Sequence, residues 1–179
     1  MRMMKIVVPL AALAVAGCSG YSWKPSVPAA MRTVAVPTFA NESDVTELGS
    51  VVTRQILREF QQEGTYRIVP PGRSAVEVQG RIRSGESKVI AYERNTGARN
   101  REHGFDVVAE VSFVDKTSGR ILVDNRVYRA HTTFLAGNDV LTGRRDASGR
   151  IAEELARQIV DDALGLGFSA VDEVKGSGK

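Results

Sequence analysis

The fold is indicated most clearly by the stretch Arg32–Val69, which reads RTVAVPTFANESDVTELGSVVTRQILREFQQEGTYRIV. Its first eight residues, 32–39, are rich in β-branched side chains and predict a strand. Pro37 has no N–H to donate, so we expect this strand to lie at a sheet edge or to end near that residue. Residues 66–69 predict a second, shorter strand.

A helix is predicted between these two strands. Asp44 is placed to cap it, with Glu47 three residues later in a pattern similar to a capping box. Gly64 is a natural end for the helix. Apolar residues recur at helical spacing in between: Leu48, Val51, Val52, Ile56, Leu57 and Phe60. A strand, helix and strand connected this closely favour parallel strands joined by a right-handed crossover.

The middle of the chain predicts two further strands. Residues 76–82 alternate in hydropathy, and this strand is expected to continue through 89–92 past an irregularity near Gly85. The polar segment 95–104 predicts a loop. Residues 105–113 alternate between apolar and mostly polar side chains, which predicts a half-buried strand.

The last part of the chain predicts a hairpin partner and a second helix. Turn chemistry over 116–119 leads into a strand over 121–133. A loop is expected over 136–145, and Gly165 and Gly167 are expected to end the helix that follows it. The apolar stripe of that helix comprises Ile151, Leu155, Ile159 and Leu164, flanked by alanines and Val160.

Two helices and a sheet, each with one apolar face, predict an α/β fold. We expect a two-layer sandwich, a mixed sheet of about four to five strands with two helices on one face. The expected organisation is a signal peptide (1–17), a lipidated N-terminus and tether (18–30), a single α/β domain (31–168) and a flexible tail (169–179).

The first eighteen residues predict export as a lipoprotein. Arg2 and Lys5 give a positively charged start, and the apolar stretch 6–15 is shorter than the roughly 20 residues of a spanning helix. The sequence Val15-Ala16-Gly17-Cys18 looks like the lipobox of bacterial lipoproteins, in which the cysteine is acylated and the preceding segment is removed. Cys18 is the one cysteine in the chain, so it has no disulfide partner. We therefore expect lipidation of Cys18 and a membrane anchor there.

Composition and motifs argue against several classes of function. Without Arg2 and Lys5, the 24 basic residues fall to 22 against 21 acidic ones, whereas nucleic-acid binding needs a clearly basic domain. His103 and His131 have no patterned carboxylate or cysteine beside them, so we expect no metal site. We find no catalytic motif and no phosphate-cradling loop, and expect a protein that is not an enzyme and has no cofactor.

Two segments carry a family resemblance. Cys18-Ser19-Gly20-Tyr21-Ser22, and Arg32–Asn41 (RTVAVPTFAN) followed by a long helix, resemble the LPS-assembly lipoprotein family (LptE-like). The most specific parts are the Gly-Tyr after the cysteine and the Val-Ala-Val-Pro-Thr-Phe-x-Asn strand, and the likeness covers most of the mature chain. Gly167-Phe168 departs mildly from the family, where an aromatic residue, often Trp, would end the helix.

The resemblance implies a lipid-anchored protein on the periplasmic face of the outer membrane. Such a protein plugs a large β-barrel (LptD-like), assists its assembly and helps to insert lipopolysaccharide into the outer leaflet. Ser19 after the cysteine fits the outer-membrane sorting rule of enterobacterial lipoproteins. The strand and helix also resemble curli-secretion lipoproteins and activators of cell-wall synthases, which remain alternatives. A curli-type pore needs a membrane-inserting hairpin, and the polar segment 95–104 does not favour one.

A local excess of basic residues marks a candidate lipopolysaccharide contact. Residues 67–101 contain eight basic and three acidic side chains. Arg81 and Arg83 are two apart, so in a strand they project from one face, opposite Ile82. Arginine can bind phosphate through a bidentate fork. The residues that we expect to contact lipopolysaccharide phosphates are Arg81, Arg83, Lys88 and Arg94.

Overall fold

The computed structural model describes residue 27 and residues 29–92, 101–136 and 139–176 of the chain. A short 3₁₀ helix, η1 (Ala29–Met31), opens the domain. The strands are β1 (Thr33–Ala35), β2 (Ala40–Asn41), β3 (Arg67–Ile68), β4 (Val76–Tyr92), β5 (Arg101–Asp115) and β6 (Ile121–Ala136). The helices are α2 (Leu48–Glu63) and α3 (Val140–Gly176).

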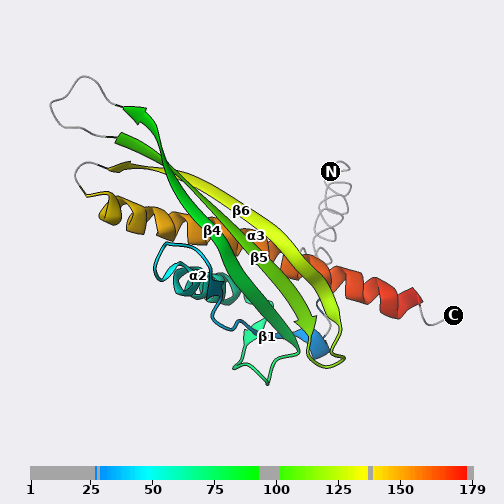
Figure 1. Cartoon of the computed structure of the whole chain (residues 1–179). Coiled ribbons are helices and arrows are strands. Elements are labelled where there is room, and N and C mark those ends of the chain that lie inside the picture. The colour runs from blue at the N-terminus through cyan, green and yellow to red at the C-terminus, as the bar shows by residue number, and fades with distance from the viewer. Residues whose placement is uncertain (1–26, 28, 93–100, 137–138, 177–179) are drawn as a thin grey trace, which may run out of the picture.

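All the strands join one mixed sheet. Its order is β3-β1-β4-β5-β6, with β2 pairing β4 beyond the end of β1. β1 is parallel to both β3 and β4, and β2 is parallel to β4, whereas β4, β5 and β6 form an antiparallel meander. Figure 1 shows the three long strands curving over the two helices, which lie on one side of the sheet. The predicted mixed sheet and two-layer α/β sandwich are confirmed.

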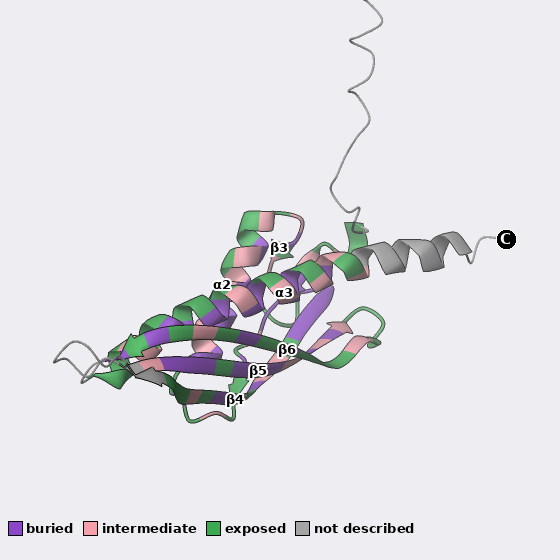
Figure 2. Cartoon of the chain, turned by 90° about the horizontal axis from the view of Figure 1, so that it is seen from above, coloured by how far each residue is buried: buried purple, intermediate pink, exposed green. Residues whose placement is uncertain are grey.

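The core lies between the inner face of the sheet and the two helices. Figure 2 shows buried positions alternating along β5, as the sequence pattern predicts. Most of the predicted helix stripes are buried, namely Leu48, Val52, Ile56, Phe60, Ile151, Leu155 and Ile159, whereas Val51, Leu57 and Leu164 at the margins are partly buried. They meet Phe105, Val107, Val111 and Phe113 of β5 in one continuous cluster.

Only the first part of the predicted strand over 32–39 is a strand in the structure. β1 ends at Ala35, and β2 begins five residues later at Ala40, so the main chain leaves the sheet around Pro37. The expectation that the strand ends near Pro37 is confirmed, because proline cannot donate a ladder hydrogen bond. β1 itself is an inner strand, and the short β3 closes that side of the sheet.

The predicted cap of the first helix is wrong. α2 begins at Leu48, and the residue before it is Glu47, which has a left-handed backbone (φ 66°) and makes no side-chain cap. The preceding segment forms its own turn, in which Asn41 Nδ2 donates to the Val45 carbonyl and Asn41 Oδ1 accepts from Ser43. This turn places Asp44 outside the helix. The predicted end is confirmed, since Gly64 (φ 74°) donates its N–H to the Phe60 carbonyl.

The central hairpin is longer than predicted. β4 runs unbroken through Tyr92, with a register shift between Ile82 and Ser84 that confirms the expected irregularity close to Gly85. Residues 101–104, predicted as loop, belong to β5 and pair with 133–136 of β6. Glu102 is compatible with this strand because it lies on the sheet face that the helices leave uncovered. His103 lies on the other face, where it is buried and its ring stacks on Phe134 at a centroid distance of 5.1 Å.

The last helix extends beyond both predicted ends. It begins at Val140 within the predicted loop 136–145, because Asp139 accepts hydrogen bonds from the N–H groups of Leu141 and Thr142. It continues through Gly165 and Gly167 to Gly176, so these glycines do not end it. Glycine lowers helix propensity by only about 1 kcal/mol relative to alanine and ends a helix only where the chain turns away.

Candidate functional site

The structure describes three of the five predicted site residues. Cys18, the expected lipid attachment point, and Arg94 lie outside the described residues. Arg81 and Arg83 lie side by side on β4. Lys88 is further along the same strand, where its ammonium forms a 2.8 Å ion pair with Glu86.

Arg81 and Arg83 form a charge cluster with two carboxylates from other elements. Arg81 Nε lies 2.9 Å from Glu110 Oε2 of β5, and Arg83 Nε lies 3.4 Å from Glu110 Oε1. Glu42, which follows β2, ion-pairs with Arg83 and lies 4.0 Å from Arg81. The two positive and two negative charges balance. The basic excess counted along 67–101 is therefore offset here by acids from distant segments.

This cluster lies on the sheet face that is turned away from the helices. Glu110 alternates with the buried Ala109 and Val111, and it pairs across the sheet with Arg81 on one side and Val127 on the other. The same face carries an exposed pair, in which His131 Nδ1 lies 2.8 Å from Asp106 Oδ1. The face therefore combines charged side chains with exposed apolar ones, among them Val127 and Leu135, and the helices leave it uncovered.

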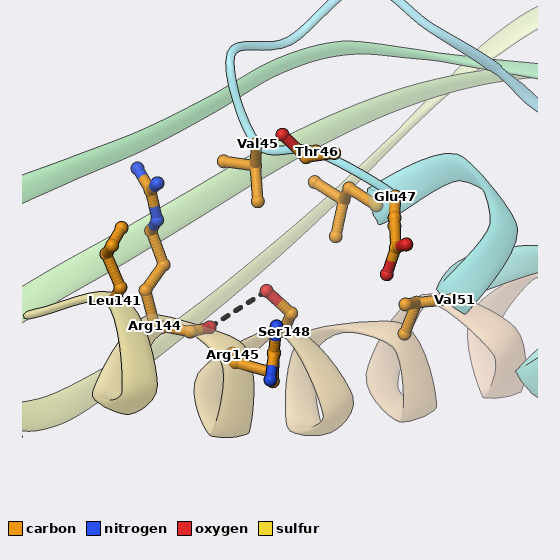
Figure 3. Close-up of a pocket in the computed structure, with 9 residues that line it drawn as sticks. Val45, Thr46, Glu47, Val51, Leu141, Arg144, Arg145 and Ser148 are labelled. Carbon is orange, nitrogen blue, oxygen red and sulfur yellow. Dashed lines mark hydrogen bonds between the residues drawn. The ribbon is translucent and has the colours of Figure 1, made fainter.

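A second candidate site is a groove of about 300 Å³ where the start of α2 meets the start of α3. Figure 3 shows side chains from α3 facing the turn before α2 and its first residues. We name this the inter-helix groove. Its lining comprises Val45, Thr46, Glu47, Leu48 and Val51 on the α2 side, and Leu141, Arg144, Arg145 and Ser148 on the α3 side.

Sequence reasoning missed the inter-helix groove, because it predicted a loop over 136–145. The spacing that would have revealed it is present in the sequence. Leu141, Arg144, Arg145 and Ser148 are related as i, i+3, i+4 and i+7, which places them on one helix face.

A third polar arrangement joins the edge of the sheet to α3. Tyr128 of β6 donates its hydroxyl to Asp162 Oδ2 at 2.6 Å, and Arg126 Nη1 binds the same oxygen at 2.6 Å. Burial raises the pKa of Tyr128 above its usual range, and the hydrogen bond to Asp162 adds to the shift. The neutral tyrosine and the ion pair hold α3 against β6, which is a structural role.

The described residues hold neither a metal-binding group of side chains nor a membrane-spanning helix. Within the described ranges, no three His, Cys, Asp or Glu side chains are grouped closely enough to hold a metal ion. Among the helices of the same ranges, none is both long and apolar enough to cross a membrane.

Comparison with solved structures supports the fold. A neuraminyllactose-binding hemagglutinin homologue from Helicobacter pylori aligns with a TM-score of 0.55 at 12% identity, covering 88% of this chain and 97% of the other. A protein from Xanthomonas campestris aligns with a TM-score of 0.52 at 9% identity, covering 83% and 94%. A hypothetical protein from Chlamydia trachomatis gives 0.50 at 11%, covering 76% and 98%. At these identities the likeness shows the fold alone.

Comparison by sequence identifies the family. No curated protein sequence matches the chain significantly. The family model for LptE, described as lipopolysaccharide-assembly, matches residues 31–163, which is well over half of the chain and nearly the whole described domain. The match includes both β1 and α2 and most of α3, so it does not depend on one short motif. The chain belongs to the LptE family of lipopolysaccharide-assembly proteins.

Proposed function

We propose that this chain is an outer-membrane lipoprotein that assists lipopolysaccharide transport and assembly as the plug and partner of a β-barrel translocon of the LptD type. The observation that carries the proposal is the LptE family match over residues 31–163. Lipid on Cys18 anchors the protein to the periplasmic face of the outer membrane. The role is binding and assembly, with no catalytic step.

The uncovered sheet face supports the plug role. Its ion pairs and exposed polar side chains, from Arg81 and Glu110 to Asp106 and His131, would meet water or another polar surface. The lumen of a large membrane barrel is itself polar. A plug packed there would gain hydrogen bonds and complementary charge more than apolar burial.

Lipopolysaccharide contact is proposed on the same face, at Arg81 and Arg83, with Lys88 and Arg94 along the hairpin. Phosphate binding there competes with Glu42 and Glu110, which already hold both guanidinium groups. This competition makes the proposal sharply testable, because removing the carboxylates and removing the arginines should have opposite effects.

The anchoring and partner are tested together in cells. The full chain and a Cys18→Ala variant are expressed, extracted in mild detergent and captured through a C-terminal tag. We expect a diacylated or triacylated N-terminal cysteine by mass spectrometry, and a large outer-membrane barrel among the co-purified proteins. The variant should lose membrane retention. An unmodified N-terminus, or recovery of a cell-wall synthase without a barrel, would contradict the proposal and favour the activator interpretation.

The lipopolysaccharide contact is tested with two double variants, each of which replaces two charged side chains of the cluster by glutamine. Arg81→Gln with Arg83→Gln should weaken binding of purified protein to lipopolysaccharide, and added salt should weaken wild-type binding, as expected for partly exposed charges. Glu42→Gln with Glu110→Gln is the matched control on the same cluster, and should strengthen binding because it frees both arginines. Equal affinity of all three proteins would remove this cluster from the site.

A further inference from the structure

The inter-helix groove carries chemistry that the fold does not use. Leu141, which lines one end, is 69% exposed, the highest exposure among the large hydrophobic side chains of the described residues. Among the described residues, neither Arg144 nor Arg145 forms an ion pair or a side-chain hydrogen bond. The hydrogen bonds from Thr142 lower the pKa of Asp139 most, and the charge of Arg145 adds to that shift at longer range.

The α3 side of the groove is held in place. Asp139 caps the helix, accepting the N–H groups of Leu141 at 3.1 Å and Thr142 at 3.2 Å. The buried Ser148 donates its hydroxyl to the Arg144 carbonyl at 2.8 Å. The two guanidinium groups therefore project from a fully formed helical turn, and a ligand would not have to order the backbone that carries them.

The α2 side is held in place as well. Glu47 keeps a left-handed backbone, an unfavourable conformation for a non-glycine residue. Its carbonyl accepts both the Val51 N–H at 2.9 Å and the Ser50 hydroxyl at 2.8 Å. Val45 and Leu48 are buried beneath the opening, so the floor of the groove is apolar and packed.

Charge and shape together define what fits. The lining has two guanidinium groups and one carboxylate, that of Glu47, so an anionic group is favoured at the Arg144 end. The exposed Leu141 offers an apolar surface beside Arg144, and Val51 lines the other end of the groove (Figure 3). A volume of about 300 Å³ is at the lower limit for ligand pockets and is too small to cover the several acyl chains of a lipid. An acid and a neighbouring apolar side chain of a peptide match it better.

We propose that the inter-helix groove docks an acidic segment of a protein partner, whose carboxylate pairs with Arg144 and Arg145 while an adjacent apolar side chain packs on Leu141. The groove is on the helical layer, whereas the Arg81 cluster is on the opposite face of the sheet. The docking site is therefore separate from the proposed lipopolysaccharide contact and is independent of it.

The experiment places a photo-crosslinking amino acid at position 141 of the full lipidated chain in cells. We expect a crosslink to a protein segment that contains an Asp or Glu next to an apolar residue, mapped by mass spectrometry. Arg144→Glu with Arg145→Glu should reduce the crosslink about tenfold or more. Arg67→Glu with Arg73→Glu is the matched control, because both are exposed arginines of the same charge located away from the groove, and it should leave the crosslink unchanged.

A charge swap completes the test. Changing the mapped acid of the partner to Arg should restore the crosslink of the Arg144→Glu, Arg145→Glu protein, provided that its thermal unfolding matches wild type. Crosslinking only to lipid, crosslinking indifferent to the charge reversal, or no crosslink at all would each overturn the proposal. A photo-crosslinker at Arg129 on the sheet face reports barrel contact separately, so failure of the groove and failure of the plug role are distinguishable.

Discussion

Phe39 fills a space that two glycines leave open, and this explains the most specific part of the family resemblance. A Cβ at Gly80 would overlap the Phe39 ring, and one at Gly49 would overlap the Phe39 carbonyl. The Phe39 N–H donates to Thr53 Oγ1 at 2.9 Å, and Thr53 donates in turn to the Gly49 carbonyl. The Val-Ala-Val-Pro-Thr-Phe-x-Asn segment therefore fixes α2 against the sheet and has a structural role.

The buried Tyr66 makes the free energy of unfolding depend on pH in the alkaline range. Burial raises its pKa from 10.0 to about 12, and its hydroxyl donates to the Ala163 carbonyl of α3 at 2.8 Å. The unfolded chain ionises this tyrosine at lower pH than the folded chain does. The contribution of Tyr66 is therefore fully present below about pH 10 and is lost as the pH rises towards about 12.

Replacing Tyr66 by Phe tests this linkage. Tyr66→Phe should cost about 1 kcal/mol at neutral pH through the lost hydrogen bond. It should also reduce the fall in the free energy of unfolding between pH 10 and 12. Urea titrations of both proteins across that range measure the difference. Tyr128 is present in both proteins, so its own pH dependence cancels in the comparison. Parallel pH curves for the two proteins would show that Tyr66 is not the group responsible.

At the scale of the elements, β6 is an edge strand that α3 protects. β6 ends the sheet order and is hydrogen-bonded to β5 alone. Arg150 Nη2 donates to the Thr133 carbonyl at 2.8 Å, and Gln158 Nε2 donates to the Arg129 carbonyl at 3.3 Å. Long exposed edges invite strand addition from other chains, and occupied carbonyls discourage it.

Removing both donors should open this edge. Arg150→Ala with Gln158→Ala is expected to promote self-association through β6, seen as dimers by light scattering at high protein concentration. Amide exchange over residues 127–135 should then be slower in the dimer than in the monomeric wild type. Arg157→Ala is the control on the same helix, since the Arg157 side chain pairs with Glu154 and, among the described residues, donates no hydrogen bond to a β6 carbonyl. A double variant that stays monomeric would show that other features protect the edge.

At the scale of the whole molecule, one core joins the sheet to both helices, and Leu155 lies within it. Leu155 is fully buried, in the cluster that also contains Ile56 of α2 and Phe105 of β5. Leu155→Ala should lower the free energy of unfolding by roughly 2–5 kcal/mol. The same change at the exposed Leu141 should cost less than about 0.5 kcal/mol. Urea denaturation of both variants measures this, and similar losses would mean that burial does not set the cost.

Local pattern predicted much of the fold. The alternation of residues 105–113, the helical stripe from Leu48 to Phe60 and the glycine at position 64 are properties of neighbouring residues, and each was confirmed. Hydrophobic periodicity reports which face of an element is buried whatever the partner is. The mixed sheet with both helices on one face follows from combining those faces. The family resemblance came from the Gly-Tyr after Cys18 together with the Val-Ala-Val-Pro-Thr-Phe-x-Asn strand.

Element ends and charge pairing depended on polar contacts that hydrophobic periodicity does not report. The ends were set by side-chain hydrogen bonds within local turns, and the charges were paired between separate strands. The turn held by Asn41 moved the start of α2 away from Asp44, and the cap at Asp139 created the helical turn that carries Arg144 and Arg145. Arg81 and Arg83 on β4 are neutralised by Glu42 and Glu110, the latter 29 residues from Arg81. Pattern along the chain determines burial because burial is a property of each element, whereas pairing is decided only when the sheet brings separate strands into register.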